Sequence, residues 1–292
     1  MSAVANPFRP PRTAHLMRRG FSNILVIALC VITAAFVVAI LLYLMFYVML
    51  QGLPNLNLGF FTELPAAFGS SGGGMGESIQ GTLVLVGLAS LFGVPLGLFM
   101  GIYLSEFGRG PFANGVRFLV TVLTGIPTII FGLFAWVLIV IPQQGFSALS
   151  GGVALGIIMI PIVATTAEDV LRLVPHEIRE ASLALGATES RTILRVVVPS
   201  ALNGIITGIV LAMARVAGET APLLMTAFGS TFWSAGLNQP IDALPLRIFV
   251  FTESPYQIQI SQAYTGSFVL IVLIVVASFL VRWATGGFRR RF

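Results

Sequence analysis

The sequence predicts an all-α, polytopic membrane protein with six transmembrane helices, and three observations lead to that prediction. The chain is 57% hydrophobic and 9% charged, with a mean hydropathy of +0.96, whereas soluble domains carry roughly 25% charged residues. Its apolar residues gather in runs of about 20 residues, the length that a helix needs to cross a bilayer. Its 16 basic residues are all arginines, and they gather between alternate runs.

The expected spans are residues 23–50, 78–104, 118–141, 152–169, 200–227 and 263–283. Because their number is even, both termini fall on one side of the membrane. That side holds every arginine except Arg247, which lies in an opposite loop, and Arg215, which lies within the fifth expected span. Since basic residues favour the cytoplasmic side, the count predicts that both termini are cytoplasmic.

The first apolar run is expected to be a retained anchor helix. It follows a basic segment, as a signal peptide would, but it is about twice as long as the usual apolar region of 7–15 residues, and it has no clear small-residue cleavage site. Residues 1–22 are expected to form a cytoplasmic tail that touches anionic lipid heads. Residues 286–292 are expected to form a second basic tail.

The chain is not expected to be an enzyme, and no metal or cofactor is expected to bind it. Cys30 is its single cysteine, and His15 and His176 lack the spacing of a metal-ligand pair. The glycine-rich stretch 69–76 lacks the Gly-Lys-Ser/Thr ending of a nucleotide-binding loop. We expect that stretch to be a flexible linker. Any ATP-driven step therefore needs another chain.

Several small residues and prolines predict how the spans pack and bend. Gly93, Gly97 and Gly101 form a stripe at four-residue spacing in the second span, which favours close helix packing in lipid. Gly125 and Pro127 in the third span, and Pro161 in the fourth, are expected to interrupt helical hydrogen bonding. Such breaks occur equally in packing bends and around cavities or gates, and the residues alone do not separate the two.

The loop between the fourth and fifth spans carries the most specific pattern. It reads Glu180-Ala181-Ser182, then Gly186, then an aliphatic segment that ends at Pro199. Pro175 suits a helix start and Gly186 a helix stop, so residues 176–185 are expected to form a short amphipathic helix. Its apolar side chains need a groove on another protein. The alternative is a helix that lies on the lipid surface, held by the loop's arginines.

This pattern resembles the EAA loop of the ABC importer permease family, with Ser182 in place of the second alanine. The resemblance implies a MetI-like permease fold over residues 76–285, with a cytoplasmic coupling loop at 171–199 that docks on an ATPase. Three further stretches resemble the PstA branch of that family, which serves phosphate import: residues 103–108, 124–134 and 214–224. Residues 244–249 also resemble it.

The resemblance implies a complete import assembly in the cytoplasmic membrane of a prokaryote. This chain would pair with a PstC-like permease, sit on a PstB-like ATPase dimer, and receive inorganic phosphate from a PstS-like binding protein. ATP and Mg²⁺ would be bound by the ATPase. The alternatives are a permease for another oxyanion (sulfate, molybdate or phosphonate) and a gradient-driven, ion-coupled transporter that works alone.

Arg215, Glu219 and Thr220 are the candidate substrate-path residues. Arg215 lies about 22 Å along the expected helix from Ser200, well within a hydrocarbon core of about 30 Å. A charged side chain at that depth costs about 2.5–3.5 kcal/mol unless it faces a polar cavity or a partner. The guanidinium offers paired donors to an oxyanion. The alternative is that Arg215 and Glu219 only neutralise each other or bridge to a partner permease.

Overall fold

The computed structural model describes residues 13–70 and 72–284. The chain divides into two compact units, residues 1–50 and 51–292. The first part of the chain holds α1 (Thr13–Gly52), η1 (Leu53–Asn55), α2 (Leu58–Thr62), α3 (Gly76–Ile102), η2 (Tyr103–Phe107), α4 (Pro111–Gly125), α5 (Thr128–Ala135), η3 (Trp136–Val140) and α6 (Ile141–Gln143). The remainder holds α7 (Ala148–Arg172), α8 (His176–Ala184), α9 (Glu189–Thr192), η4 (Ile193–Val197), α10 (Val198–Ala217), α11 (Ala221–Thr226), α12 (Leu244–Thr252) and α13 (Gln257–Ala284).

The membrane-spanning character of the chain is confirmed. Five described helices are long and apolar enough to cross a bilayer, and a sixth crossing results if the bent pair around Ile126 is one span. That pair corrects the third expected span, because α4 ends at Gly125 and the chain turns by 102° before α5 begins at Thr128. Pro127 caps α5 and fixes the backbone dihedral φ at the turn.

The fifth expected span, 200–227, is not one helix. α10 ends at Ala217, and the separate helix α11 begins at Ala221. Gly218 caps α10, and Pro222 near the start of α11 has no N–H to continue a helical ladder. Glu219 therefore lies in the break, and Arg215 lies in the last turn before it.

The interruption expected at Pro161 is absent, because α7 runs from Ala148 to Arg172 through that proline. A transmembrane helix tolerates an internal proline when neighbouring groups satisfy the freed backbone. Pro161 has no N–H to donate to the Ile157 carbonyl, and α7 continues past that missing bond. Pro161 therefore does not break the fourth span.

The first helix is longer than expected. α1 covers 40 residues, so residues 13–22, which were expected to belong to a tail, are helical. No proline occurs between residues 13 and 22 to stop the helix. Residues 1–12 of the expected N-terminal tail, and the whole expected C-terminal tail 286–292, lie outside the described residues.

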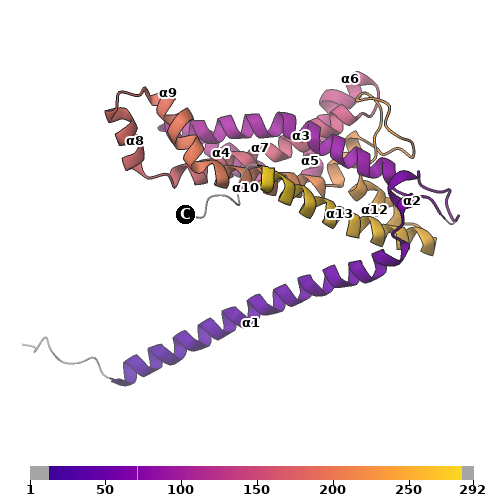
Figure 1. Ribbon diagram of the computed structural model, residues 1–292, viewed down its shortest axis with the longest axis horizontal. Coiled ribbons are helices and arrows are strands. Elements are labelled where there is room, and N and C mark those ends of the chain that lie inside the picture. Colours follow the sequence, from indigo (N-terminus) through magenta and orange to yellow (C-terminus); the bar gives the residue numbers. More distant parts are fainter. Residues whose placement is uncertain (1–12, 71, 285–292) are drawn as a thin grey trace, which may run out of the picture. The chain divides into compact units, whose positions relative to one another are not determined.

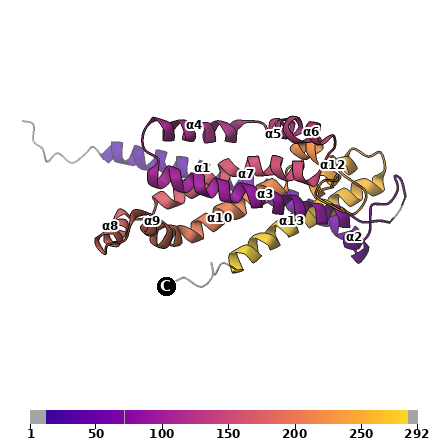
Figure 2. The same cartoon turned by 90° about the horizontal axis from the view of Figure 1, so that it is seen from above.

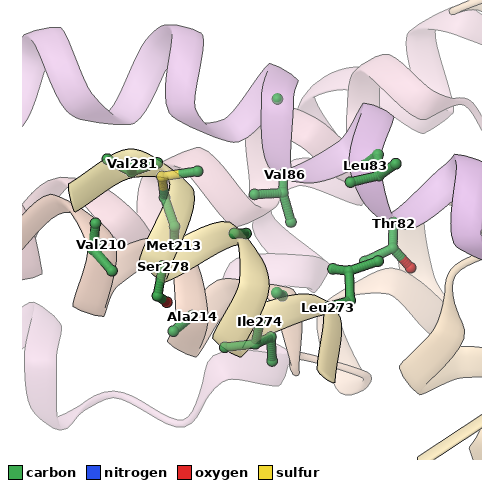
Figure 3. Close-up of a pocket in the computed structure, with 13 residues that line it drawn as sticks. Thr82, Leu83, Val86, Val210, Met213, Ala214, Leu273, Ile274, Ser278 and Val281 are labelled. Carbon is green, nitrogen blue, oxygen red and sulfur yellow. The ribbon is translucent and has the colours of Figure 1, made fainter. Parts of the chain in front are cut away.

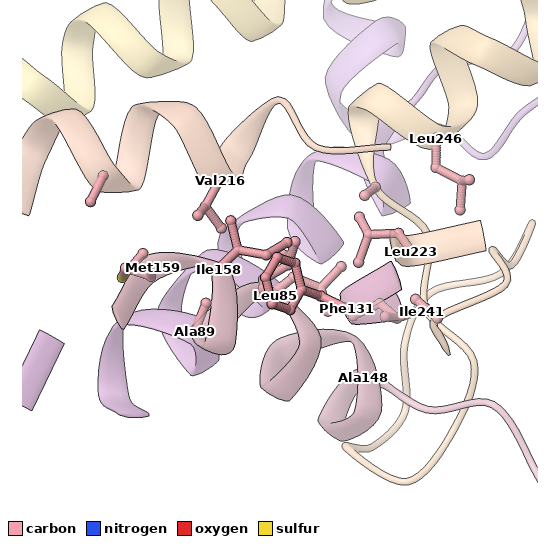
Figure 4. Packing of buried hydrophobic residues seen from close by; sticks show 14 of the residues in the cluster. Leu85, Ala89, Phe131, Ala148, Ile158, Met159, Val216, Leu223, Ile241 and Leu246 are labelled. Carbon is pink, nitrogen blue, oxygen red and sulfur yellow. The ribbon is translucent and has the colours of Figure 1, made fainter. Parts of the chain in front are cut away.

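The core of the second unit is built around α3 and α7, which pack along the predicted glycine stripe (Figures 1 and 2). A Cβ atom on Gly93, Gly97 or Gly101 would come within 2.8 Å of α7 side-chain atoms. Figure 4 shows buried side chains from α3, α5, α7, α10 and α11 meeting in one cluster that includes Val216. Packing of Val216 in this cluster fixes the end of α10, and with it the backbone of Arg215, the preceding residue.

The glycine-rich stretch 69–76 is not a loose linker along its whole length. Gly74 N–H donates to the Leu64 carbonyl, and Met75 N–H donates to the Phe60 carbonyl, each at about 3 Å. Met75 is fully buried. The second half of the stretch therefore packs against α2, and its glycines permit close backbone contact there.

Candidate functional site

Arg215 and Glu219 form a loose pair across the break between α10 and α11. Arg215 Nη2 lies 3.7 Å from Glu219 Oε1, and the Arg215 side chain is 55% exposed. Charge-assisted hydrogen bonds of this type are about 2.7–2.9 Å long. The contact is longer than that, so the guanidinium keeps donors for another ligand.

Arg215 lines a partly open cavity of about 270 Å³. Two threonines, Thr124 and Thr128, line it together with apolar residues of α4, α5 and α7. Among the described lining residues, Arg215 alone is charged. The Thr124 hydroxyl donates to the Thr121 carbonyl at 2.7 Å. The cavity therefore offers an oxyanion the positive charge of Arg215 and the hydroxyl donor of Thr128.

The two interrupted helices lie next to each other at this cavity. α5, which follows the first break, packs against α11, which follows the second. A Cβ atom on Gly132 would lie 2.6 Å from Pro222 Cα, so the two backbones touch there. Transporters commonly place their ligand sites where interrupted helices meet within the membrane. Pro161 also lines the cavity, although α7 is unbroken.

A second concavity, between α3, α10 and α13, has a different character. It has a volume of about 160 Å³ and is lined by side chains such as Val86, Met213 and Ile274 (Figure 3). None of its described lining residues is charged. It therefore offers an anion no positive charge.

The predicted amphipathic helix in the loop is present as α8 (His176–Ala184). Gly186 follows it with a backbone φ of +83°, in the left-handed region that favours glycine. Three apolar side chains, Ile178, Leu183 and Leu185, are exposed around it, and Leu185 is 90% exposed. Pro199 lies in the first turn of α10. The exposed apolar side chains at α8 are suited to contact another protein.

Arg179 joins α8 to η2 and to the end of α7. The sequence did not indicate this contact. Arg179 donates from Nη2 and Nε to the two carboxylate oxygens of Glu106, at 2.8 and 3.2 Å. It also donates to the Leu171 and Val174 carbonyls at the end of α7. Because a bidentate pair fixes distance and orientation, α8 is held to α7 and to η2 at the end of α3.

A second buried polar cluster, which the sequence also did not indicate, joins the first turn of α3 to α12. Arg247 Nε donates to Asp242 Oδ2 at 2.7 Å, and Ser78 Oγ lies 2.6 Å from the same oxygen. Glu77 Oε1 lies 3.8 Å from Arg247 Nε. Burial raises the pKa of Asp242 above its ordinary value, whereas the Arg247 guanidinium acts against that shift.

The structure thus brings some of the predicted site residues together and separates others. Arg215, Glu219 and Pro161 lie around or beside one cavity, and Thr220 N-caps α11. Gly125 and Pro127 end α4 and begin α5 next to it. The loop residues Glu180, Ala181, Ser182 and Gly186 lie apart, at and just beyond α8 (Figure 1).

The family model and the named relatives that match this chain are all transport permeases. The family model described as "Binding-protein-dependent transport system inner membrane component" matches residues 93–292. The PstA phosphate transport system permease protein of Yersinia pestis is 37% identical over 265 residues, covering 90% of each chain. The protein of the same name from Xylella fastidiosa strain 9a5c is 42% identical over 230 residues, covering 78% of this chain and 80% of its own.

Solved structures agree on the fold. A chain of a bacterial alginate ABC transporter matches with a TM-score of 0.59 at 14% identity, covering 96% of this chain and 98% of its own. A chain of the inward-facing MetNI methionine ABC transporter matches with a TM-score of 0.56 at 20% identity, covering 71% and 90%. At these identities the likeness concerns the fold, and the predicted permease fold is confirmed.

Proposed function

Because the chain belongs to the family of binding-protein-dependent transport system inner membrane components, we propose that it is a permease subunit of an ATP-driven importer of inorganic phosphate. The observation that carries this proposal is the single positive charge of Arg215 in the cavity where the two interrupted helices meet. Relatives named as phosphate transport permeases, at 37% and 42% identity, support the choice of phosphate.

Phosphate would be bound by Arg215 and passed along the cavity. The guanidinium presents planar, paired donors that match two oxyanion oxygens, and Thr124 and Thr128 line the same space. Glu219 is close enough to hold Arg215 when no substrate is present. Its carboxylate would also accept a hydrogen bond from a protonated phosphate oxygen, a donor that sulfate lacks at neutral pH.

ATP hydrolysis would be carried out by another subunit, which also binds the Mg²⁺. α8 lies in the coupling segment 171–199 and carries exposed apolar side chains, including Leu183 and Leu185, for a groove on that ATPase. When the ATPase moves α8, the Arg179–Glu106 ion pair would transmit that movement to α3 and α7. A second, PstC-like permease would close the path, and a PstS-like binding protein would deliver phosphate to it.

The orientation of the chain follows from this docking. α8 must lie in the cytoplasm to meet an ATPase, which also places both termini there if the bent pair is one crossing. The arginine distribution supports the same orientation. The Asp242–Arg247 cluster then lies at the outer end of the bundle.

The test is reconstitution of this chain in vesicles with its second permease, its ATPase and the binding protein. Phosphate-loaded binding protein should stimulate ATP hydrolysis and phosphate uptake, and the same protein offered sulfate should not. Phosphate uptake by this chain alone, driven by an ion gradient, would contradict the proposal. Equal stimulation by sulfate would contradict the choice of substrate.

A further inference from the structure

The buried cluster at the outer end of α3 has no part in the proposed phosphate path. Glu77 and Ser78 lie in the first turn of α3, Asp242 precedes α12, and Arg247 lies within α12. All four residues are at most 7% exposed. Asp242 and Arg247 also line an open cavity of about 380 Å³, whereas Glu77 and Ser78 do not. Two carboxyl groups therefore share one guanidinium, and ionising Glu77, on the buried side, is costly.

The hydrogen bonds within the cluster require an additional proton. Ser78 Oγ lies 2.9 Å from Glu77 Oε1 and 2.6 Å from Asp242 Oδ2. A serine hydroxyl has one hydrogen, so it donates to only one of these oxygens. The other contact is attractive only if that carboxyl group is protonated and donates to Ser78 Oγ.

The position of Arg247 indicates which carboxyl group carries the proton. Arg247 Nε lies 2.7 Å from Asp242 Oδ2 but 3.8 Å from Glu77 Oε1, so it stabilises the ionised form of Asp242. Glu77 Oε2 is buried and has no hydrogen-bond partner among the described residues. An unpartnered oxygen costs much less in a neutral carboxylic acid than in a carboxylate.

Among the described residues, Arg247 is the cation that forms ion pairs with Glu77 and Asp242. The elements in contact with α3 are α2, η2, α7, α10 and α12. The charged residue of α10, Arg215, lines the cavity with Thr124 and Thr128 and lies near Glu219. Glu106 of η2 is paired with Arg179. Glu63 follows α2 and Glu253 follows α12, but both are exposed. The charged residues of α7 lie in its last two turns, at the opposite end of the bundle.

We propose that Glu77 is a proton-binding site and that its proton locks the start of α12 to α3. Glu77 Oε1–H donates to Ser78 Oγ, Ser78 O–H donates to Asp242 Oδ2, and Arg247 Nε–H donates to the same oxygen. Loss of the proton removes the first of these donors. It also leaves two negative charges beside one positive charge.

The hydrogen bonds of this cluster also position the chain segments that follow the α10–α11 break. Arg247 Nη2 donates to the Ser230 carbonyl at 2.9 Å, which fixes the loop after α11. Leu244 N–H donates to Thr82 Oγ1 at 2.8 Å, which fixes the first turn of α12 to α3. Deprotonation of Glu77 would therefore loosen the outer part of the chain beyond the α10–α11 break.

Infrared spectroscopy of the full chain, assembled in its complex, tests where the proton lies. A protonated carboxylic acid has a C=O stretch distinct from that of a carboxylate. We expect this band at neutral pH, its loss as the pH is raised, and its absence in Glu77→Gln. A band that persists in Glu77→Gln and disappears in Asp242→Asn would overturn the assignment, as would an unchanged spectrum in Glu77→Gln.

Thermal unfolding of the same complexes tests the lock. The thermal midpoint of the wild type should fall as the pH rises above the ordinary pKa of a glutamate, because the folded state keeps a proton that the unfolded chain releases, and Glu77→Gln should remove that part of the fall. The exposed Glu253→Gln is the matched control and should keep the wild-type profile. If Glu77→Gln does not assemble, Ser78→Ala should shift the frequency of the wild-type band. An unshifted band, or a Glu77→Gln profile identical to that of the wild type, would overturn the proposal.

Discussion

Arg215 and Glu219 face each other across the end of a helix, with Nη2 and Oε1 3.7 Å apart and α10 ending at Ala217 between them. A tight bidentate pair would occupy two of the five guanidinium N–H donors and neutralise the charge. The break instead leaves Arg215 half-exposed over a cavity lined by Thr124 and Thr128. The pair is therefore arranged so that an anion can replace Glu219 as the partner of Arg215.

Gly186→Val should release the ATPase. The backbone φ of +83° costs a residue with a side chain about 1–2 kcal/mol, and a β-branched residue tolerates it poorly. No atom lies within 4 Å of a Cβ placed at Gly186, so the effect would come from the backbone and not from a clash. Co-purification of the ATPase measures it. Gly145→Val, also in open space, is the control, and equal ATPase recovery in both variants would refute the docking role.

Arg179→Gln should leave the ATPase bound but weaken its coupling to transport. The exposed apolar side chains around α8 remain, whereas the bidentate contact with Glu106 is lost. Phosphate-stimulated ATP hydrolysis should fall by at least roughly tenfold, since a hydrogen bond to a charged group contributes about 1.5–3 kcal/mol. The exposed Arg195→Gln serves as control. Full stimulation in Arg179→Gln would show that this contact does not transmit the movement.

Gly132→Val should prevent α5 from packing on α11. Its side chain would meet the Pro222 backbone, which cannot move aside as a flexible side chain can. Overpacking of this kind typically costs about 1–3 kcal/mol, so the thermal midpoint of the purified chain should fall. Gly115→Val on α4, where a Cβ meets open space, should leave the midpoint nearly unchanged. Equal midpoints would mean that the two interrupted helices do not depend on this contact.

Thr128→Val should weaken phosphate transport without affecting assembly. The change keeps the shape of the side chain but removes a hydroxyl donor from the cavity. A hydrogen bond to a charged group contributes about 1.5–3 kcal/mol, so the phosphate concentration at half-maximal uptake should rise at least about tenfold. Thr121→Val on the exposed side of α4 provides the comparison. An unchanged concentration dependence would remove Thr128 from the path.

Much of the fold could be predicted because lipid imposes simple rules on a sequence. Long apolar runs form spanning helices, and the small-residue stripe at Gly93, Gly97 and Gly101 marks the contact between α3 and α7. The loop pattern likewise predicted α8 and its end at Gly186. These features depend on local composition and spacing, which a sequence displays directly.

The site was harder to predict because it depends on contacts between distant segments. The apolar run 200–227 gave no sign that α10 ends at Ala217, because apolarity alone does not distinguish a continuous span from an interrupted one. Glu106 and Arg179 are 73 residues apart, and Ser78 and Asp242 are 164 apart. No periodicity links such pairs, so only the packed structure brings them together.

Uptake of labelled phosphate by vesicles that contain the whole importer, with wild-type or Arg215→Gln permease, tests the central claim most directly. Gln keeps a polar side chain but is shorter and lacks the charge, so uptake should fall by at least about tenfold. The amount of assembled complex, measured by co-purification of the other subunits, should be unchanged. Near-normal uptake by a correctly assembled Arg215→Gln complex would contradict the assignment of Arg215 to the phosphate path.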